Sequence, residues 1–298
     1  MVLIFGFFFA FAFFVFVELR LMVLHPVKTI GYTVRDIYRY FHDRSYDRYD
    51  GGKLDCYSAH FGGGKSLSGV HEVLWTYHRY NNKRIYDRQR KKWVLQKIYI
   101  LSNIDFVSVP SEPLIGLHQM VNYAELNKKI DEENDTRSCI LVLLDEASSQ
   151  LNSRAFKNNF SPDVINSLIT CRHYHLSFFY CSQKFHLTDS LLRSVTQRVI
   201  WCEKKWRFMV LRYYDADEME NATNPLMVKP IKTTGFFITD ADFDAYDTLA
   251  TVEMLVKDTK AGKMLSEAEI LALRGNMNPD SDNIMKPSRK LRKARKRA

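Results

Sequence analysis

Residues 59–66 read AHFGGGKS, and they follow a short strand-like segment, KLDCYS, at residues 53–58. This pattern is typical of a phosphate-binding loop, in which consecutive backbone N–H groups surround the phosphates of a nucleotide. The stretch departs from the pattern at its first position, where Ala59 replaces the usual glycine. One methyl group at this turn is a modest steric cost, so we expect the loop to form.

The loop continues into a predicted helix, and its residues have distinct predicted roles. Apolar side chains recur at helical spacing through residues 66–80, so the N-terminus of a helix would point at the bound anion. Lys65 would reach the β- and γ-phosphate oxygens, and the Ser66 hydroxyl would ligate Mg²⁺. The alternative is a glycine-rich surface turn that carries a lysine, as DGGK at residues 50–53 also does. The predicted nucleotide-binding residues are Gly62, Gly63, Gly64, Lys65, Ser66 and Leu67.

An acidic pair follows an apolar run at residues 138–144. A continuous apolar run bounded by turn signals is typical of a strand buried on both faces, and ligands bind where such parallel strands end. At that end Asp145 would hold Mg²⁺, largely through water, and Glu146 would orient and activate the attacking water. The alternative is a helix that begins with two acids, where negative charge is favourable in any case. Both motifs in this order predict an ATPase with ATP and Mg²⁺ as cofactors.

Strand-like and helix-like segments alternate along residues 51–255, which predicts an α/β domain of the P-loop NTPase type. Such alternation gives a mostly parallel central sheet with helices on both faces. One strand tip carries Gln183, whose amide would reach the γ-phosphate or its water. We also expect an acidic turn at residues 131–135 and a short helix capped by Thr188. The predicted strands are residues 53–58, 93–104, 138–144, 176–181, 198–202 and 235–239, and the predicted helices are residues 66–80, 115–130, 161–171 and 188–194.

Charge and cysteine content restrict the partners and the compartment. The net charge is +9, but eight basic residues lie in the segment Lys286–Ala298, so the rest of the chain is nearly neutral. This basic tail could contact DNA or acidic lipids. The five cysteines are an odd number without CxxC spacing, which favours reduced, packed thiols in a cytosolic domain.

The N-terminal residues are strongly apolar. Residues 1–17 contain no charged side chain and eight phenylalanines, so residues 1–24 are a candidate transmembrane helix and residues 25–50 a juxtamembrane connector. Basic residues after this helix would place the ATPase domain, residues 51–255, in the cytoplasm. Residues 256–298 would form a C-terminal segment that ends in a disordered basic tail. The alternatives for the N-terminus are a buried Phe-rich helix and a true start at Met22.

A basic stretch at residues 81–93 also contains tyrosine and tryptophan. Such composition suits contact with a nucleic-acid backbone together with stacking on bases or sugars. The alternative is a solvated hairpin or loop. The predicted DNA-binding residues are Lys83, Arg84, Arg88, Arg90, Lys91 and Lys92.

A set of short motifs occurs in a fixed order along the chain. The motifs are LSNI at residues 101–104, LDEA at 144–147, NSR at 152–154, RHY at 172–174, SQ at 182–183 and LLR at 191–193. This ordered set resembles the zonular occludens toxin-like (Zot) ATPases, the filamentous-phage assembly proteins, which belong to the wider FtsK/HerA class of DNA-pumping ATPases. The resemblance covers about residues 53–210.

The resemblance implies a motor that uses ATP to drive phage DNA export and virion assembly at the host inner (cytoplasmic) membrane. Its implied partners are phage or plasmid DNA, other virion-assembly proteins and further copies of the chain in a ring such as a hexamer. By the same resemblance Arg172 would sense or complete a neighbouring nucleotide site, with Arg193 and Arg198 as weaker candidates. Family members commonly carry their membrane helix after the ATPase core, whereas the candidate here precedes it.

Two other functions remain open at this point. A viral genome-packaging or plasmid DNA-coupling ATPase would share the motifs and differ in where the DNA goes. A nucleotide-binding membrane scaffold with little hydrolysis belongs to another class. Ala59 slightly favours the scaffold, while Glu146 and Gln183 favour a working enzyme.

Overall fold

The computed structural model describes residues 13, 16–151, 162–224 and 227–246. Most of the predicted N-terminal helix, the segment 256–298 and the motif at residues 152–154 lie outside these residues, so their structures stay predictions. Within the described part of the chain, none of the helices combines the length and apolar character that a membrane crossing requires.

The chain divides into two compact units. The smaller unit comprises residues 1–48 and 84–93, and the larger unit comprises residues 49–83 and 94–298. In its described part the smaller unit contains helices α2 (Val17–Leu24) and α3 (Pro26–His42), the short 3-10 helix η1 (Ser45–Asp47) and most of strand β2 (Lys83–Asp87).

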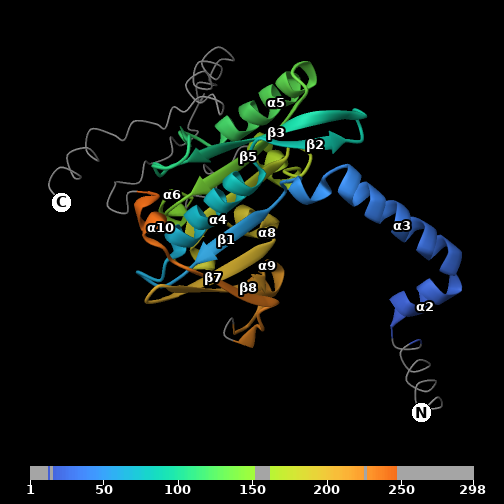
Figure 1. Ribbon diagram of the computed structural model, residues 1–298. Helices are drawn as coiled ribbons and strands as arrows, with labels where there is room; N and C mark the ends of the chain where they lie inside the picture. Colours follow the sequence, from blue (N-terminus) through green and yellow to red (C-terminus); the bar gives the residue numbers. More distant parts are fainter. Residues whose placement is uncertain (1–12, 14–15, 152–161, 225–226, 247–298) are drawn as a thin grey trace. The chain divides into compact units, whose positions relative to one another are not determined.

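The larger unit is built on a mostly parallel sheet (Figure 1). Its parallel part has the order β3-β5-β6-β1-β7, and β8 and β9 follow β7 as antiparallel strands. A short strand, β4, pairs with β3. The predicted parallel sheet is therefore confirmed, while β8 was not predicted. The strands are β1 (Leu54–Ser58), β3 (Lys92–Ser102), β4 (Glu112–Pro113), β5 (Thr136–Leu144), β6 (Leu176–Ser182), β7 (Arg198–Lys205), β8 (Phe208–Asp215) and β9 (Lys232–Phe237).

Helices connect these strands and cover both faces of the sheet, as right-handed crossovers between parallel strands require. Helix α4 lies on one face, whereas α5, α7 and α8 lie on the other (Figure 1). The helices of the larger unit are α4 (Lys65–Tyr80), α5 (His118–Glu133), α6 (Ala147–Gln150), α7 (Pro162–Ile169), the 3-10 helix η3 (Phe185–Leu187), α8 (Ser190–Val195), α9 (Ala216–Asn221) and α10 (Asp240–Asp244).

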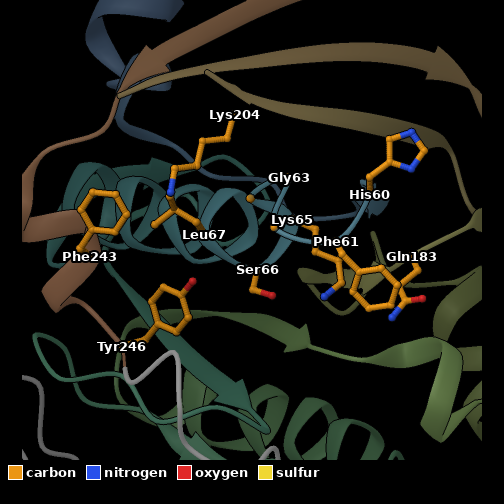
Figure 2. A pocket seen from close by; sticks show the side chains of 12 residues that line it. His60, Phe61, Gly63, Lys65, Ser66, Leu67, Gln183, Lys204, Phe243 and Tyr246 are labelled. Carbon is orange, nitrogen blue, oxygen red and sulfur yellow. The ribbon is translucent and has the colours of Figure 1, made fainter. Parts of the chain in front are cut away.

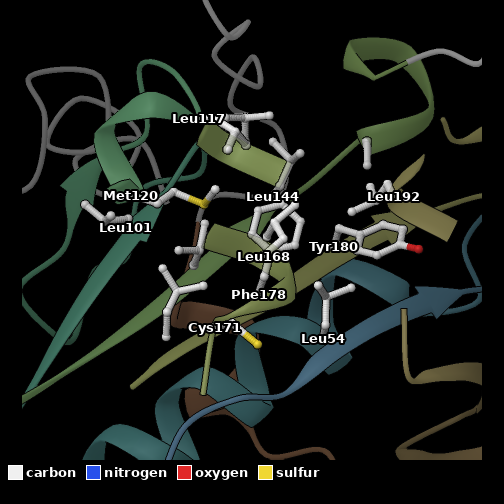
Figure 3. Close-up of a cluster of buried hydrophobic side chains, with 14 of the residues drawn as sticks. Leu54, Leu101, Leu117, Met120, Leu144, Leu168, Cys171, Phe178, Tyr180 and Leu192 are labelled. Carbon is white, nitrogen blue, oxygen red and sulfur yellow. The ribbon is translucent and has the colours of Figure 1, made fainter. Parts of the chain in front are cut away.

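Strand β5 shows how the sheet separates two hydrophobic cores. Its side chains alternate between the faces, so Val142 belongs to one core and Leu143 to the other. The first core also contains Met120 from α5 and Leu168 from α7 (Figure 3). Because both faces are covered, the strand is apolar from Cys139 to its end at Leu144 and is buried at all but its first residue.

Two local predictions were wrong. Helix α5 continues to Glu133, because the buried Asp131 carboxylate accepts hydrogen bonds from the backbone N–H of Ser138 at 2.7 Å and from its hydroxyl at 2.6 Å. These partners come from β5, so tertiary contact replaces the predicted acidic turn. Helix α8 is capped by Asp189, which accepts from the Leu191 N–H at 2.8 Å, and Thr188 instead donates its hydroxyl hydrogen bond to a backbone carbonyl.

The cysteines agree with the prediction of packed thiols. All five are free and buried. Burial raises the pKa of the Cys202 thiol to about 12, so this group stays protonated at neutral pH.

Candidate nucleotide site

The glycine-rich loop lies at the carboxyl edge of the parallel sheet, between β1 and α4. Gly62 and Gly64 have φ angles of 71° and 87°, in the left-handed region that favours glycine. Gly64 also has no room for a side chain, because a Cβ there would overlap the terminal methyl of Met209 from β8. Helix α4 begins directly afterwards at Lys65, so the first N–H groups of the helix face the space above the loop.

Ala59 fits the loop because of the glycine opposite. Its side chain is fully buried. A Cβ built at Gly63 would lie 2.8 Å from the Ala59 methyl, which is too close for two carbon atoms. The methyl group therefore occupies the space that Gly63 leaves, and the departure from the usual loop pattern does not distort the loop.

Lys65 pairs with the acidic motif. Its Nζ lies 2.8 Å from a carboxylate oxygen of Glu146. Burial opposes protonation of Lys65, but the hydrogen bond that Lys65 donates to Glu146 and the negative charge of the nearby Asp145 outweigh it, so the lysine pKa is raised. The site thus holds a permanent cation between the loop and the end of β5.

Asp145 is held in place through its backbone. Its N–H donates to the Asn103 side-chain oxygen at 2.7 Å, and the Asn103 amide donates to the Asp145 carbonyl at 2.9 Å. The Gln150 amide donates to the same carbonyl at 3.1 Å. Sequence analysis did not give Asn103 or Gln150 a role, although Asn103 lies in the LSNI motif. These amides position Asp145 while leaving its carboxylate free for another partner.

The carboxylate of Asp145 fits a magnesium ion. Its Oδ1 is buried and has no hydrogen-bond partner among the residues that the structure describes. A buried, unpaired carboxylate oxygen is costly, and a cation would remove that cost. Mg²⁺ prefers oxygen ligands and takes one or two carboxylates together with phosphates and water. Asp145 and the hydroxyl of Ser66, at the start of α4, would hold the ion. A magnesium ion that is held partly by phosphates needs no cluster of three or more protein ligands. The described residues contain no such cluster.

Glu146 adopts an unusual backbone conformation. Its φ of 54° is left-handed, which is uncommon for a residue with a side chain and is found often at functional sites. The turn ends β5 and starts α6 at Ala147. It brings the Glu146 carboxylate to Lys65 and leaves about one third of that side chain exposed, at 34%. A carboxylate in this position is accessible to a water molecule beside the phosphates.

Gln183 reaches the same space from the strand between the two motifs. Strand β6 lies between β1 and β5, and Gln183 follows its last residue. The Ser58 hydroxyl donates to the Gln183 carbonyl at 3.2 Å, which joins the ends of β1 and β6. Gln183 and the loop line a cavity of about 210 Å³ (Figure 2). The predicted position of Gln183 at the nucleotide is consistent with this geometry.

Three further residues line the cavity, and sequence analysis missed them. Phe243 and Tyr246 lie on the side away from Gln183, and Lys204 lies between them and the loop (Figure 2). The Lys204 Nζ is 4.9 Å from the centre of the Phe243 ring, a cation–π distance. Only tertiary structure brings these residues to the loop, because they come from β7, α10 and the residues that follow α10.

The three arginines carried over from the resemblance lie elsewhere. Arg172 is exposed in the turn before β6 and packs beside Gly52, at the amino edge of the sheet, opposite the loop. Arg193 pairs with Glu220 at 2.8 Å. Arg198 pairs with the buried carboxylate of Asp55 at 2.6 Å, which gives it a structural role in this chain. A role for Arg172 at the site of a neighbouring subunit stays a prediction.

The predicted DNA-binding residues lie along a hairpin, and all of them except Lys83 belong to the smaller unit. Residues 83–87 are strand β2, and Lys92 begins β3. Arg88 pairs with Asp43 and Arg90 with Asp87, so part of the positive charge is neutralised locally. DNA binding by this hairpin stays a prediction.

Comparison with known proteins gives similarity of fold only. No family model matches the chain, and no curated protein sequence matches it. The N-terminal domain of zonular occludens toxin from Neisseria meningitidis is similar at 15% identity over 65% of this chain and 98% of that chain, with a TM-score of 0.43. It belongs to the family that the sequence resembles.

Two other solved structures are similar at the same level. The genome packaging NTPase B204 from Sulfolobus turreted icosahedral virus 2, in complex with ATP-γS, has 9% identity over 63% of this chain and 98% of that chain, with a TM-score of 0.38. ATPases 2 and 3 of EssC from Geobacillus thermodenitrificans have 14% identity over 51% of this chain and 32% of that chain, with a TM-score of 0.34. With TM-scores below 0.5, these similarities support no conclusion about activity.

Proposed function

We propose that this chain binds and hydrolyses ATP with Mg²⁺ and uses the energy to move DNA. One arrangement carries the proposal: the loop lysine Lys65 contacts Glu146 at 2.8 Å, beside an Asp145 carboxylate oxygen that is buried and unpartnered among the described residues. A structural turn would need neither a buried acid without a partner nor a glutamate in a left-handed conformation. Both features are expected where a protein binds a nucleotide with its metal.

The residues divide the chemistry between them. The N–H groups of the loop and the Lys65 cation would hold the phosphates, and Mg²⁺ held by Ser66 and Asp145 would neutralise their charge. Lys65 must then exchange Glu146 for a phosphate oxygen. This exchange frees the Glu146 carboxylate to orient a water molecule and accept its proton. Gln183 would contact the γ-phosphate or that water from the tip of β6.

The base would lie on the other side of the loop. Lys65, Glu146 and Gln183 mark the side where the γ-phosphate reacts, so the nucleoside would extend toward Phe243 and Tyr246 (Figure 2). Aromatic rings stack on any base, so this side of the cavity would discriminate weakly between ATP and GTP.

The DNA-moving part of the proposal is supported by the Zot resemblance. In this proposal the chain works as a homo-oligomeric ring at the cytoplasmic membrane during phage DNA export and virion assembly. A genome-packaging or plasmid-coupling ATPase would use the same site and is the second candidate within this class. The scaffold is less well supported. Ala59 favoured it as a sign of an impaired phosphate loop, but the Ala59 methyl fits against Gly63.

ATP hydrolysis by the detergent-solubilised chain, with and without single- and double-stranded DNA, tests the proposal. Lys65→Ala should abolish turnover. Lys53→Ala is the matched control, because Lys53 also follows a pair of glycines but forms its ion pair with Glu72 outside the cavity, at 2.9 Å. DNA-stimulated turnover that is lost in Lys65→Ala and kept in Lys53→Ala would support a DNA motor. Turnover that does not change when DNA is added would indicate an ATPase of another kind. Tight ATP binding without turnover would support the scaffold.

A further inference from the structure

Helix α3 exposes an entire apolar face. Five large apolar side chains recur every three or four residues, which places them on one side of the helix. In water such a face is normally buried against a core. No residue of α3 is buried. The exposed fractions are 83% for Val27, 66% for Ile30, 63% for Val34, 54% for Ile37 and 65% for Phe41.

Helix α4 shows the usual alternative within the same chain. It is of nearly the same length, and its apolar residues Val70 and Val73 are almost completely buried against the sheet. The sequence pattern of α3 is more strongly amphipathic than that of α4, and the described residues of its own unit provide no surface that covers the stripe. An apolar stripe of this length without cover in its own unit indicates a partner outside that unit.

The polar side of α3 carries a row of cations along one flank. Lys28, Arg35 and Arg39 are spaced by seven and four residues, so they lie together on one side of the helix, within the polar face opposite the apolar stripe. The single acid of the helix, Asp36, lies on the same polar face. A surface that receives α3 must therefore accept an apolar stripe backed by a polar face with three cations and one acid.

Two tyrosines flank the stripe and suit a boundary between water and an apolar phase. Tyr38 and Tyr40 are both exposed, and each joins an apolar ring to a polar hydroxyl. Tyr32 lies on the polar face, where the Arg35 guanidinium is 4.6 Å from the centre of its ring.

We propose that α3 lies flat on an anionic lipid surface, with its apolar stripe in the acyl region and its cations at the headgroups. Interfacial helices are strongly amphipathic, carry a basic polar face and are not apolar all round, and α3 has these three properties. Four charged residues within α3 exclude it as a spanning helix. The contact is separate from the span predicted at residues 1–24, and it does not depend on the proposed ATPase activity.

A fluorescent label on each side of the helix tests this orientation in the full chain. The five native cysteines are buried, so Val34→Cys and Asp36→Cys each introduce one accessible thiol for an environment-sensitive dye. Each labelled chain is reconstituted into vesicles of phosphatidylcholine alone or of phosphatidylcholine with phosphatidylserine. A neutral aqueous quencher, acrylamide, and brominated lipids report on which side of the interface the dye lies.

With anionic vesicles, we expect the dye at position 34 to shift to shorter wavelength, lose acrylamide quenching and gain quenching by brominated lipid. The dye at position 36 should remain accessible to acrylamide. Replacing Lys28, Arg35 and Arg39 by glutamine in the Val34→Cys chain should return the signal to the level seen with neutral vesicles, since each cation strengthens binding to an anionic surface by about fivefold.

Three results would overturn the proposal. The dye at position 34 could stay accessible to acrylamide on both kinds of vesicle, or both dyes could respond alike. Protection of the dye at position 34 from acrylamide could also depend on the density of protein in the vesicles and not on lipid charge. That result would show that a second copy of the chain covers the stripe. ATP turnover and thermal unfolding of each variant control for folding, because none of the substituted side chains of α3 is buried.

Discussion

Lys65 and Glu146 meet at 2.8 Å although the strands that precede them in the chain, β1 and β5, are not neighbours in the sheet. Strand β6 lies between β1 and β5, so the ion pair crosses the tip of a strand. The pair holds the lysine in place before a nucleotide arrives, and a phosphate must compete with the glutamate for it. Nucleotide binding and release of the Glu146 carboxylate would therefore occur together.

Replacing Glu146 by glutamine should separate binding from hydrolysis. The amide keeps the size and one oxygen that can accept from Lys65, but it cannot accept a proton from water. We expect ATP affinity to be retained and turnover to fall by about a hundredfold or more, the usual contribution of a general base. Equilibrium binding of a fluorescent ATP analogue and phosphate release measure the two quantities. Undiminished turnover would remove Glu146 from this role.

Replacing Asp145 by asparagine should change the metal dependence. The buried Oδ1 has no hydrogen-bond partner among the described residues, so the substitution breaks no hydrogen bond of that atom. We expect a thermal midpoint close to that of the parent chain and ATP binding that no longer strengthens with added Mg²⁺. Mg²⁺ titrations of nucleotide binding at fixed ionic strength measure this. A parent-like Mg²⁺ response in the variant would place the metal elsewhere.

Replacing Phe243 by alanine should weaken both ATP and GTP. Loss of a stacked ring beneath a base costs roughly tenfold in affinity, and the loss should be the same for the two nucleotides. Phe237→Ala is the matched control, because Phe237 is half exposed at 50% and does not line the cavity. Competition binding measures the ratio. A defect for one nucleotide only would indicate recognition by hydrogen bonds to the base.

The stability of the fold should depend on pH through His175. Burial lowers its pKa to about 4, and the nearby Arg137 cation adds to this. The pKa of a histidine in the unfolded chain is near 6.5. Between pH 4 and pH 6.5 the unfolded chain therefore binds a proton at His175 that the folded chain does not bind. The free energy of unfolding should therefore fall as the pH decreases from 6.5 toward 4.

Urea unfolding at several pH values measures the effect of His175. Asparagine is the best replacement, because position 175 has a left-handed φ of 51° that asparagine tolerates. The His175→Asn chain should show a smaller loss of stability over the same range of pH. An unchanged slope would show that other groups dominate the acid response.

Sequence analysis succeeded where local patterns decide the structure. The glycine loop, the apolar strand before Asp145 and the helix after Lys65 all follow from short stretches that have one favourable conformation. It failed where side-chain contacts between successive elements decide. Residues 131–133 stay helical because Ser138, seven residues further on in β5, supplies donors for Asp131, and the acidic composition of the segment does not show this contact.

The same distinction applies to the site. Lys65, Gln183 and the acidic pair were predicted because they follow strands whose ends share one edge of the sheet. Phe243 could not be predicted, because the antiparallel strands β8 and β9 carry the chain back toward the loop before it. Lys204 could not be predicted, because it lies in β7 beyond residue 202, where the predicted strand ends. Thr188 and Asp189 are both good capping residues, and only the start of the helix at Ser190 selects the second.

The contact between Gly64 and Met209 links the loop to a strand far away in the sequence. A side chain at position 64 would face two separate penalties, one from the left-handed backbone and one from the methionine methyl. Shortening Met209 relieves only the second. Substituting Gly64 alone and together with a shortened Met209 would therefore separate the torsional part of the glycine requirement from its steric part, within one chain.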